Sequence, residues 1–230
     1  MSITLRPVSD YAAQFGVKCI AYGPPGGGKT PAIDTAPRPV MLITEPGVLS
    51  LRHSSVPSFD ALTPERIDQF FDWLVGSNET KNFDTVCIDS GSQMAETILL
   101  QELSKTSKGG AKRHGLEAYG DMARKAMMYF RNLFFLQQKH VYIVAKQMML
   151  QDGSMIIKKP YFPGQELNVQ VPHLYDLVMH CDLTQHQQQG QVKAFRTVGT
   201  LDILARDRSG KLAELEPINL AYIFDKIMKG

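Results

Sequence analysis

Four short apolar segments recur along the first two thirds of the chain, with helical or irregular stretches between them. They cover residues 17–22, 39–44, 85–89 and 141–145. Near-continuous apolar runs bounded by polar residues are typical of strands that are buried on both faces of a parallel sheet. The pattern therefore predicts an α/β protein with a mostly parallel, twisted central sheet.

Between these segments, apolar positions recur at the spacing of helices. One helix is predicted over 64–75 and another over 92–103, because apolar side chains there fall three or four positions apart. A longer helix is expected from about Leu116 to Gln138, with a stripe of methionine and aromatic side chains on its buried side. We interpret this stripe as core packing, so that helices flank the sheet.

The last third of the chain has a different character. Three strands of a more antiparallel C-terminal extension are predicted at residues 179–182, 194–197 and 200–205. The glutamine-rich residues 185–190 between the first two are expected to form a hairpin tip. Asn219 is expected to cap a final helix that closes over the sheet.

Composition adds few constraints on function. The chain has 230 residues, of which 43% are hydrophobic, enough for one substantial core. Because neither a repeat nor a dividing linker is evident, residues 1–230 are expected to form one domain, with residues 1–15 as an N-terminal arm. The net charge of +2 is too small to indicate a nucleic-acid partner by itself.

The cysteines and the apolar segments indicate a cellular location. Three widely spaced cysteines lie inside apolar runs, without the spacing of metal ligands or of a disulfide framework, at Cys19, Cys87 and Cys181. The first residues lack the apolar region of a signal peptide, and no stretch approaches the ~18 apolar residues of a membrane span. We therefore expect a cytoplasmic protein without a membrane partner.

Residues 23–30 carry the most specific chemical signal in the chain. They read Gly-Pro-Pro-Gly-Gly-Gly-Lys-Thr and match the phosphate-binding pattern G-x-x-x-x-G-K-[ST] directly after an apolar run. Glycines let backbone N–H groups turn toward phosphates, Lys29 brings a charge to the β and γ oxygens, and the Thr30 hydroxyl is placed to bind Mg²⁺. The predicted nucleotide site comprises Gly23, Pro24, Pro25, Gly26, Gly27, Gly28, Lys29 and Thr30. Pro31 falls in the first turn of the helix expected to follow, where its missing N–H costs little.

Three strand ends supply further candidates. A phosphate loop needs a second acidic anchor for Mg²⁺ on a neighbouring strand, and Asp89 ends the run 85–89. Ser90 follows it, so the base that AAA-type ATPases carry at that position is absent. Glu45, after the strand 39–44, is the candidate base for the water that attacks the γ-phosphate; the alternative is a solvated acid in a turn. Gln147, after the strand 141–145, is a candidate contact to the γ-phosphate; the alternative is a solvated strand end.

These parts together resemble the RecA-like ATPase core. In that family the phosphate-loop strand is followed by strands that end in a catalytic Glu, in Asp-Ser and in a sensor Gln, which match Glu45, Asp89-Ser90 and Gln147. The small size and three tail segments are similar to the phage RecA-like ATPases of the Sak type, minimal RecA cores linked with single-strand annealing and recombination. Those segments are residues 163–167, 174–176 and 205–212. The resemblance covers about residues 15–228 and implies ATP with Mg²⁺ as the bound nucleotide.

The first candidate DNA-binding loop is the segment 104–115. It is rich in glycine, contains no acid and carries four positive charges, at Lys105, Lys108, Lys112 and Arg113. A mobile basic loop can track a phosphate backbone, although on charge alone a solvated loop is equally expected. Its position after the Asp89 strand corresponds to the first DNA-binding loop of RecA, which favours the DNA role.

The second candidate loop is the segment 148–171, which follows Gln147 as the second DNA loop of RecA follows its sensor. Lys158 and Lys159 stand beside Tyr161 and Phe162, a combination that can pair phosphate contact with base stacking. Packing of the two aromatic side chains against the sheet is the alternative.

Arg206 and Arg208 are candidates for a catalytic role across a subunit boundary. In RecA-like oligomers a basic pair in a comparable late position reaches the γ-phosphate of the neighbouring subunit and stabilises the transition state. Here arginines stand where bacterial RecA has lysines, and exposed hairpin charges are the alternative.

The main functional hypothesis is an ATP-hydrolysing, single-stranded-DNA-binding protein of phage-type homologous recombination or strand annealing. The resemblance implies stimulation by DNA or by a neighbour, a homo-oligomer in the form of a ring or filament, a single-strand-binding protein as a further partner, and the host cytoplasm for a phage-encoded chain. Two other hypotheses use the same phosphate loop. One is a small-molecule kinase with residues 105–115 as a lid, and the other is a nucleotide-switched assembly module with negligible hydrolysis.

Overall fold

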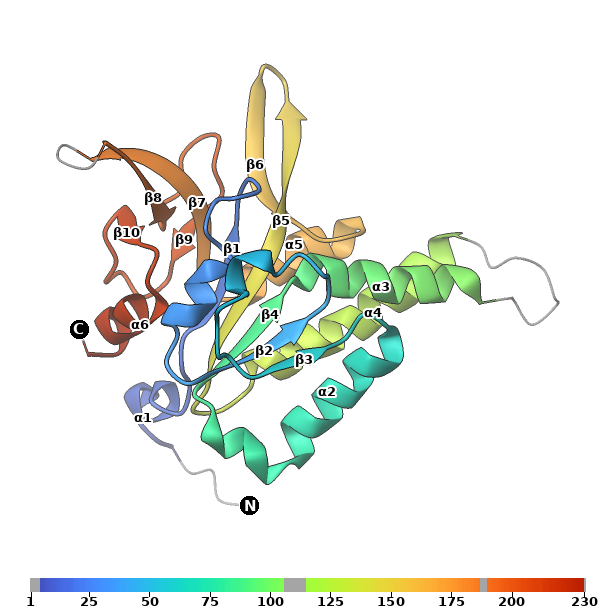
Figure 1. Cartoon of the computed structure of the whole chain (residues 1–230). Coiled ribbons are helices and arrows are strands. Elements are labelled where there is room, and N and C mark those ends of the chain that lie inside the picture. The colour runs from blue at the N-terminus through green and yellow to red at the C-terminus, as the bar shows by residue number, and fades with distance from the viewer. Residues whose placement is uncertain (1–4, 106–114, 187–189, 230) are drawn as a thin grey trace.

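The computed structural model describes residues 5–105, 115–186 and 190–229. Within these residues the strands form one ten-stranded mixed sheet, whose main path runs in the order β10-β8-β7-β1-β5-β4-β2-β3 (Figure 1). The strands are β1 (Lys18–Tyr22), β2 (Pro39–Ile43), β3 (Ser58–Asp60), β4 (Thr85–Asp89), β5 (His140–Asp152), β6 (Met155–Tyr161), β7 (Leu177–His186), β8 (Gly190–Arg196), β9 (Arg206–Asp207) and β10 (Leu215–Pro217).

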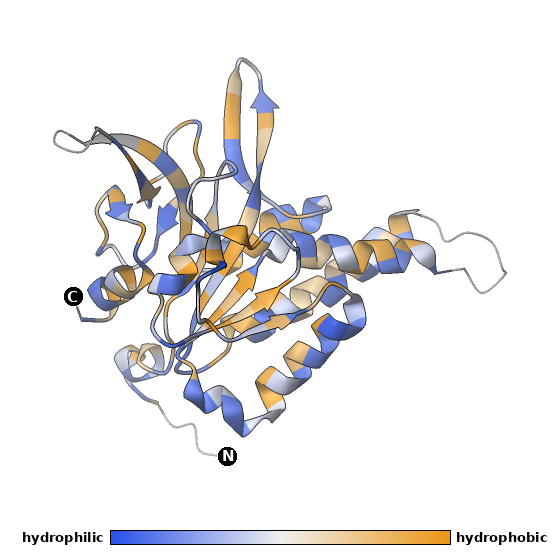
Figure 2. Cartoon of the chain, viewed as in Figure 1, coloured by the Kyte–Doolittle hydropathy of each residue, from blue (hydrophilic) through white to orange (hydrophobic). Residues whose placement is uncertain are grey.

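The centre of the sheet is parallel, as the apolar runs predicted. β7, β1, β5, β4, β2 and β3 pair with one another in parallel register, and every residue of β1 and β4 is buried. Figure 2 shows the central strands as hydrophobic, whereas the helices alternate between apolar and polar positions. The predicted fold class, a mostly parallel sheet flanked by helices, is confirmed.

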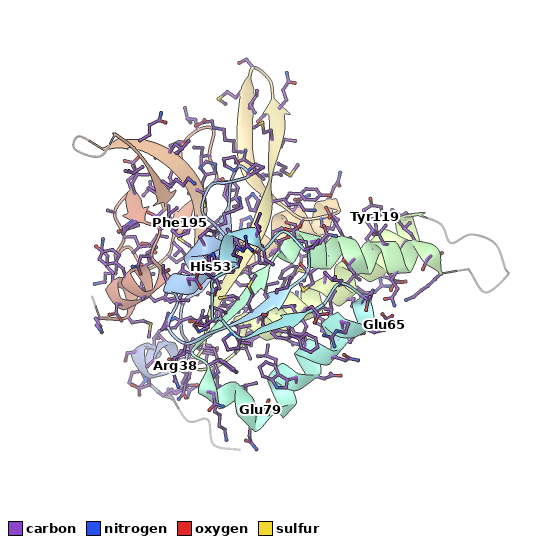
Figure 3. The ribbon with its side chains drawn as sticks, viewed as in Figure 1. Arg38, His53, Glu65, Glu79, Tyr119 and Phe195 are labelled. Carbon is purple, nitrogen blue, oxygen red and sulfur yellow. The ribbon has the colours of Figure 1, made fainter. Side chains whose placement is uncertain are left out.

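Helices cover both faces of the sheet. They are α1 (Val8–Ala12), α2 (Pro64–Gly76), α3 (Gly91–Ser104), α4 (Gly115–Phe134), α5 (Gln165–Leu174) and α6 (Leu220–Lys229), with short 3-10 helices at Pro31–Thr35, Leu49–Leu51 and Asn78–Asn82. Residues of α2 to α5 share one buried cluster with the sheet. On the other face, α6 and the helix Pro31–Thr35 share a second cluster with Phe195 of β8, which is labelled in Figure 3. Among the described residues, the structure has no helix with the length and apolar character that crossing a membrane needs.

The C-terminal extension is antiparallel, with one departure from the predicted strands. β7 and β8 form a hairpin, β10 pairs with β8, and β9 pairs with β7. The strand predicted over 200–205 is wrong, because Thr200 closes a turn: its N–H donates to Ile203 O and its hydroxyl to Asp202 Oδ1. Asn219 caps α6 as predicted, since its Oδ1 accepts a hydrogen bond from Tyr222 N at 3.0 Å.

The segment after Gln147 is ordered structure and not an irregular loop. β5 continues past the parallel core and folds back on β6 in an antiparallel hairpin, which projects from the sheet in Figure 1. Gly153, with a φ of +60°, lies between the two strands, in the turn. Residues 148–171 therefore consist of this hairpin, a short connection and the first part of α5.

Candidate nucleotide site

The carboxyl ends of four parallel strands open onto one cavity of about 620 Å³. These strands are β1, β2, β4 and β5, and they bring together residues that lie far apart in the sequence. The predicted site residues that line the cavity are Gly23, Pro24, Pro25, Gly26, Lys29, Thr30, Glu45, Asp89 and Gln147. The candidate phosphate, magnesium, base and sensor groups thus share one space.

The glycines of the phosphate loop permit a path that a side chain would block. Gly28 has a φ of +101°, and a Cβ on it would lie 2.8 Å from Ile218 Cδ1. Gly27 donates a backbone hydrogen bond to Pro24 O, and a Cβ on it would lie 3.0 Å from Cys181 Cβ. The loop is therefore seated directly on β7. The positive φ requires glycine at Gly28, whereas a Cβ at Gly27 would need Cys181 to shift by a few tenths of an ångström.

The helix after the loop is short. Pro31 occupies its first position, as expected, but only the five residues Pro31–Thr35 follow as a 3-10 helix. Tyr142 of β5 supports the end of the loop, because its buried side chain donates a hydrogen bond to Lys29 O at 2.8 Å. The loop and Lys29 are therefore better placed to hold a phosphate than a helix dipole is.

Lys29 is turned back onto its own loop. Its Nζ donates to Gly23 O and to Pro24 O, both at 2.8 Å. Burial lowers the pKa of Lys29, while the nearby Cys181, Asp89 and Glu45 raise it. The ammonium group therefore lies within the curve of the loop, beside the acids that face the same cavity.

Thr30 and Asp89 are in direct contact. The Thr30 hydroxyl donates to Asp89 Oδ2 at 2.6 Å, and Asp89 is only 3% exposed. Burial raises the pKa of Asp89 to about 6; Glu45 also raises it, while the Thr30 hydrogen bond and Lys29 lower it. A hydroxyl and a carboxylate side by side suit Mg²⁺, which takes oxygen ligands and binds through one or two carboxylates together with phosphates. The residues present therefore fit a magnesium ion at this point.

Thr44 fixes the distance between the two acidic strand ends, a role that sequence reasoning missed. Its hydroxyl accepts a hydrogen bond from Ser90 N and donates one to Ser90 O, both at 2.8 Å. This pair ties the end of β2 to the end of β4, so Glu45 and Asp89 face the same cavity. Glu45 is half-buried there, and its charge acts on both Asp89 and Lys29.

Gln147 of β5 is tied to β7, on the far side of β1, and is not a freely solvated strand end. Its Oε1 lies 2.9 Å from His180 Nε2 on β7, and its side chain lines the cavity at the edge shared with a second cavity of about 290 Å³. Beside it, Lys146 is held by Glu96 of α3 at 2.5 Å.

The two candidate arginines lie elsewhere in their own chain. Arg206 donates to Pro172 O and Tyr175 O, both at 2.6 Å, and Arg208 donates to carbonyls of the same helix end. Both therefore bind the C-terminal end of α5, and neither lines the nucleotide cavity of this chain. A catalytic role within the same chain does not fit this position, and action on a neighbouring subunit stays a prediction.

The candidate DNA contacts are only partly described. Lys105 is ion-paired with Glu102 at 2.6 Å, while Lys108, Lys112 and Arg113 lie outside the described residues. Lys158 and Lys159 lie on β6 of the projecting hairpin, with Lys158 Nζ 4.0 Å from Asp202.

The aromatic neighbours of these lysines differ from each other. Phe162 is fully buried and packs edge-on against Phe130, with ring centroids 5.3 Å apart. Stacking of Phe162 on a base is therefore excluded in this conformation, whereas Tyr161 is half-buried.

The sheet order and the site define a class of protein. A phosphate loop follows a central parallel strand, and one strand, β5, separates it from the strand that carries Asp89. This is the arrangement of a RecA-like P-loop ATPase domain. The chain belongs to the AAA_24 family, described as an AAA domain, whose model matches residues 16–209. Although the chain belongs to this family, Ser90 follows Asp89 at the position where AAA-type ATPases carry an acid.

Two of the solved structures to which this chain is similar come from archaea. A KaiC-like protein from Pyrococcus horikoshii OT3 aligns with 12% identity and a TM-score of 0.40, over 79% of this chain and 77% of that one. The flagellar accessory protein FlaH from Methanocaldococcus jannaschii aligns with 10% identity and a TM-score of 0.40, over 89% and 87%. No curated protein matches the sequence.

Proposed function

We propose that this chain is an ATP-hydrolysing protein that binds single-stranded DNA and acts in recombination or strand annealing, as phage RecA-like proteins of the Sak type do. The observation that carries the ATPase half is the single cavity that Lys29, Thr30, Glu45, Asp89 and Gln147 line together. It combines a phosphate cradle, a magnesium pair, a carboxylate base and an amide within one space.

Each group has a distinct role in this proposal. The loop N–H groups and Lys29 bind the phosphates, and Thr30 with Asp89 holds Mg²⁺, which when bound offsets the charge of the phosphate oxygens. Glu45 orients the attacking water and accepts its proton. Gln147 donates a hydrogen bond to the γ-phosphate and marks the presence of the triphosphate.

The DNA half of the proposal is supported by the hairpin of β5 and β6. Gln147 lies at the base of this hairpin, opposite Pro160, so the γ-phosphate contact and the projecting strands belong to one element. Lys158 and Lys159 supply phosphate contacts on β6. Met149 and Ile156 beside them are exposed apolar side chains, against which bases can pack.

The remaining parts of the proposal concern assembly. Both arginines are hydrogen-bonded at the end of α5, and Arg208 is the more exposed of the two. Arg208 is therefore the one proposed to reach the nucleotide of a second copy in a ring or filament. A single-strand-binding protein is proposed as a further partner, and the host cytoplasm as the location for a phage-encoded chain.

The test is the rate of ATP hydrolysis with and without single-stranded DNA, over a range of salt concentrations. We expect slow hydrolysis that DNA stimulates, with DNA binding that weakens steeply as salt rises. Hydrolysis without stimulation and without salt-sensitive binding contradicts the DNA half alone. A phosphorylated nucleoside or nucleotide acceptor in place of free phosphate contradicts the ATPase half and favours a kinase.

A further inference from the structure

His180 is a buried histidine next to the nucleotide cavity. It lies on β7, in parallel register with Tyr22, the last residue before the phosphate loop. The residue is 3% exposed. The Tyr22 ring packs edge-on against the imidazole, with ring centroids 5.0 Å apart. The contact that matters is the one from Nε2 to Gln147 Oε1, at 2.9 Å.

The partners of the two ring nitrogens fix the state of His180. An amide oxygen only accepts hydrogen bonds, so Nε2 carries the hydrogen and donates it. Nδ1 is fully buried and has no hydrogen-bond partner among the described residues. A proton on Nδ1 would therefore be buried without an acceptor, and burial lowers the pKa of His180. The ring is neutral at neutral pH, with its hydrogen on Nε2.

This contact decides which end of the Gln147 amide is free. With Oε1 held by His180, the NH₂ end has no hydrogen-bond partner among the described residues and remains for the cavity that Gln147 lines. Phosphate oxygens accept hydrogen bonds and repel another acceptor, so only the NH₂ end can bind a γ-phosphate. A Gln147 side chain without His180 can present either end.

We infer that His180 is a positioning residue, which holds the side-chain oxygen of Gln147 so that its amide nitrogen is presented to the γ-phosphate of a bound triphosphate. This inference rests on the proposed function and assigns a residue on β7 to the discrimination between triphosphate and diphosphate. The competing explanation is that His180 only fills space between β1, β5 and β7.

Two substitutions of similar size separate these explanations. His180→Gln keeps a donor near the place of Nε2, whereas His180→Met fills a similar volume and has no donor. Affinity for a non-hydrolysable ATP analogue and for ADP, both with Mg²⁺, is measured for each variant. Thermal unfolding midpoints establish that each variant is folded.

We expect His180→Met to lower the preference for the triphosphate analogue over ADP by about twofold to tenfold, the cost of ordering the unrestrained Gln147 side chain on binding, with ADP affinity unchanged. His180→Gln should keep most of the preference. In a Gln147→Ala background, His180→Met should have no further effect on the preference, because the two residues act through one contact.

The inference is overturned if the Met and Gln variants behave alike, if affinity for ADP falls as much as affinity for the analogue, or if the effects of His180→Met and Gln147→Ala simply add. These outcomes leave the proposed function intact. Failure of the unaltered protein to bind either nucleotide would instead contradict the proposed function, and the inference with it.

Discussion

Replacement of Asp89 by Asn should make the nucleotide-free protein more stable while removing its ability to bind magnesium and ATP. Asp89 is 3% exposed, and it accepts a hydrogen bond from the Thr30 hydroxyl. An Asn side chain has almost the same shape, and its oxygen can accept the same hydrogen bond. The substitution therefore removes the buried charge and little else.

The size of the effect follows from the pKa of Asp89, which burial raises from 3.8 to about 6. At about 1.36 kcal/mol for each tenfold change in the acid constant, ionisation of Asp89 costs the folded state about 3 kcal/mol. The folded protein holds this proton more tightly than the unfolded chain does. The destabilisation of the folded state by ionised Asp89 is therefore absent below about pH 4, grows between about pH 4 and pH 6, and is complete above that range.

The assay is urea unfolding of both proteins at several pH values between 4 and 8, without nucleotide. We expect Asp89→Asn to raise the free energy of unfolding by about 1–3 kcal/mol at pH 8, with a gain that disappears toward pH 4. Asp72→Asn, on the exposed side of α2, is the matched control and should change stability by less than about 0.5 kcal/mol. A less stable Asp89→Asn protein, or a gain that does not depend on pH, would refute the reasoning.

Three further predictions follow from the loop, the hairpin and α5. Gly28→Ala should weaken ATP binding roughly tenfold or more, because a φ of +101° strains any residue with a Cβ and the Ile218 side chain would have to shift; nucleotide titration measures this. Joint replacement of Lys158 and Lys159 by Ala should reduce the slope of log affinity against log salt for single-stranded DNA by about 1.4, at about 0.7 per phosphate contact. Arg206→Ala should lower the free energy of unfolding by about 1–3 kcal/mol, measured in urea, and leave ATP affinity unchanged, because its contacts are two carbonyls of α5.

The first two of these predictions have a control on the same chain, and the third has an outcome that would contradict it. Gly76→Ala meets no atom within 4 Å and should leave ATP affinity unchanged; an equal loss in both glycine variants would contradict the loop geometry. Replacement of the exposed Lys81 and Lys229 should leave the salt slope unchanged; an equal reduction would mean that only overall charge matters. Loss of ATP affinity in Arg206→Ala without loss of stability would argue for a direct catalytic role.

The parallel core and the phosphate loop could be predicted because their signals are local. Strands such as 85–89 are continuously apolar, and the motif at 23–30 carries its chemistry within eight residues. Glu45 and Asp89 could also be proposed, since ligand groups gather at the carboxyl ends of parallel strands.

Contacts between distant residues could not be predicted in the same way. The hydrogen bonds of Thr44, Tyr142 and His180 join residues 46, 113 and 33 positions apart. These hydrogen bonds depend on the strand order and register, which cannot be deduced from residue patterns in a single sequence. The contacts of Arg206 with the end of α5 could not be predicted for the same reason.

The hairpin of β5 and β6 is a different case, because its signal was present in the sequence. Gly153-Ser154 between apolar segments is a local indication of a two-residue hairpin turn. The resemblance to RecA led to the interpretation of 148–171 as a second DNA-binding loop. Here the local turn chemistry was the better guide to structure.

The most direct test of the central claim, that one cavity binds ATP and hydrolyses it with Glu45 as the base, is the single-turnover rate of ATP hydrolysis in Glu45→Gln. The account predicts a loss of about a hundredfold or more in the rate, the usual contribution of a general base, with ATP affinity retained. An unchanged hydrolysis rate in this variant would contradict the account, because the base would then have to lie elsewhere.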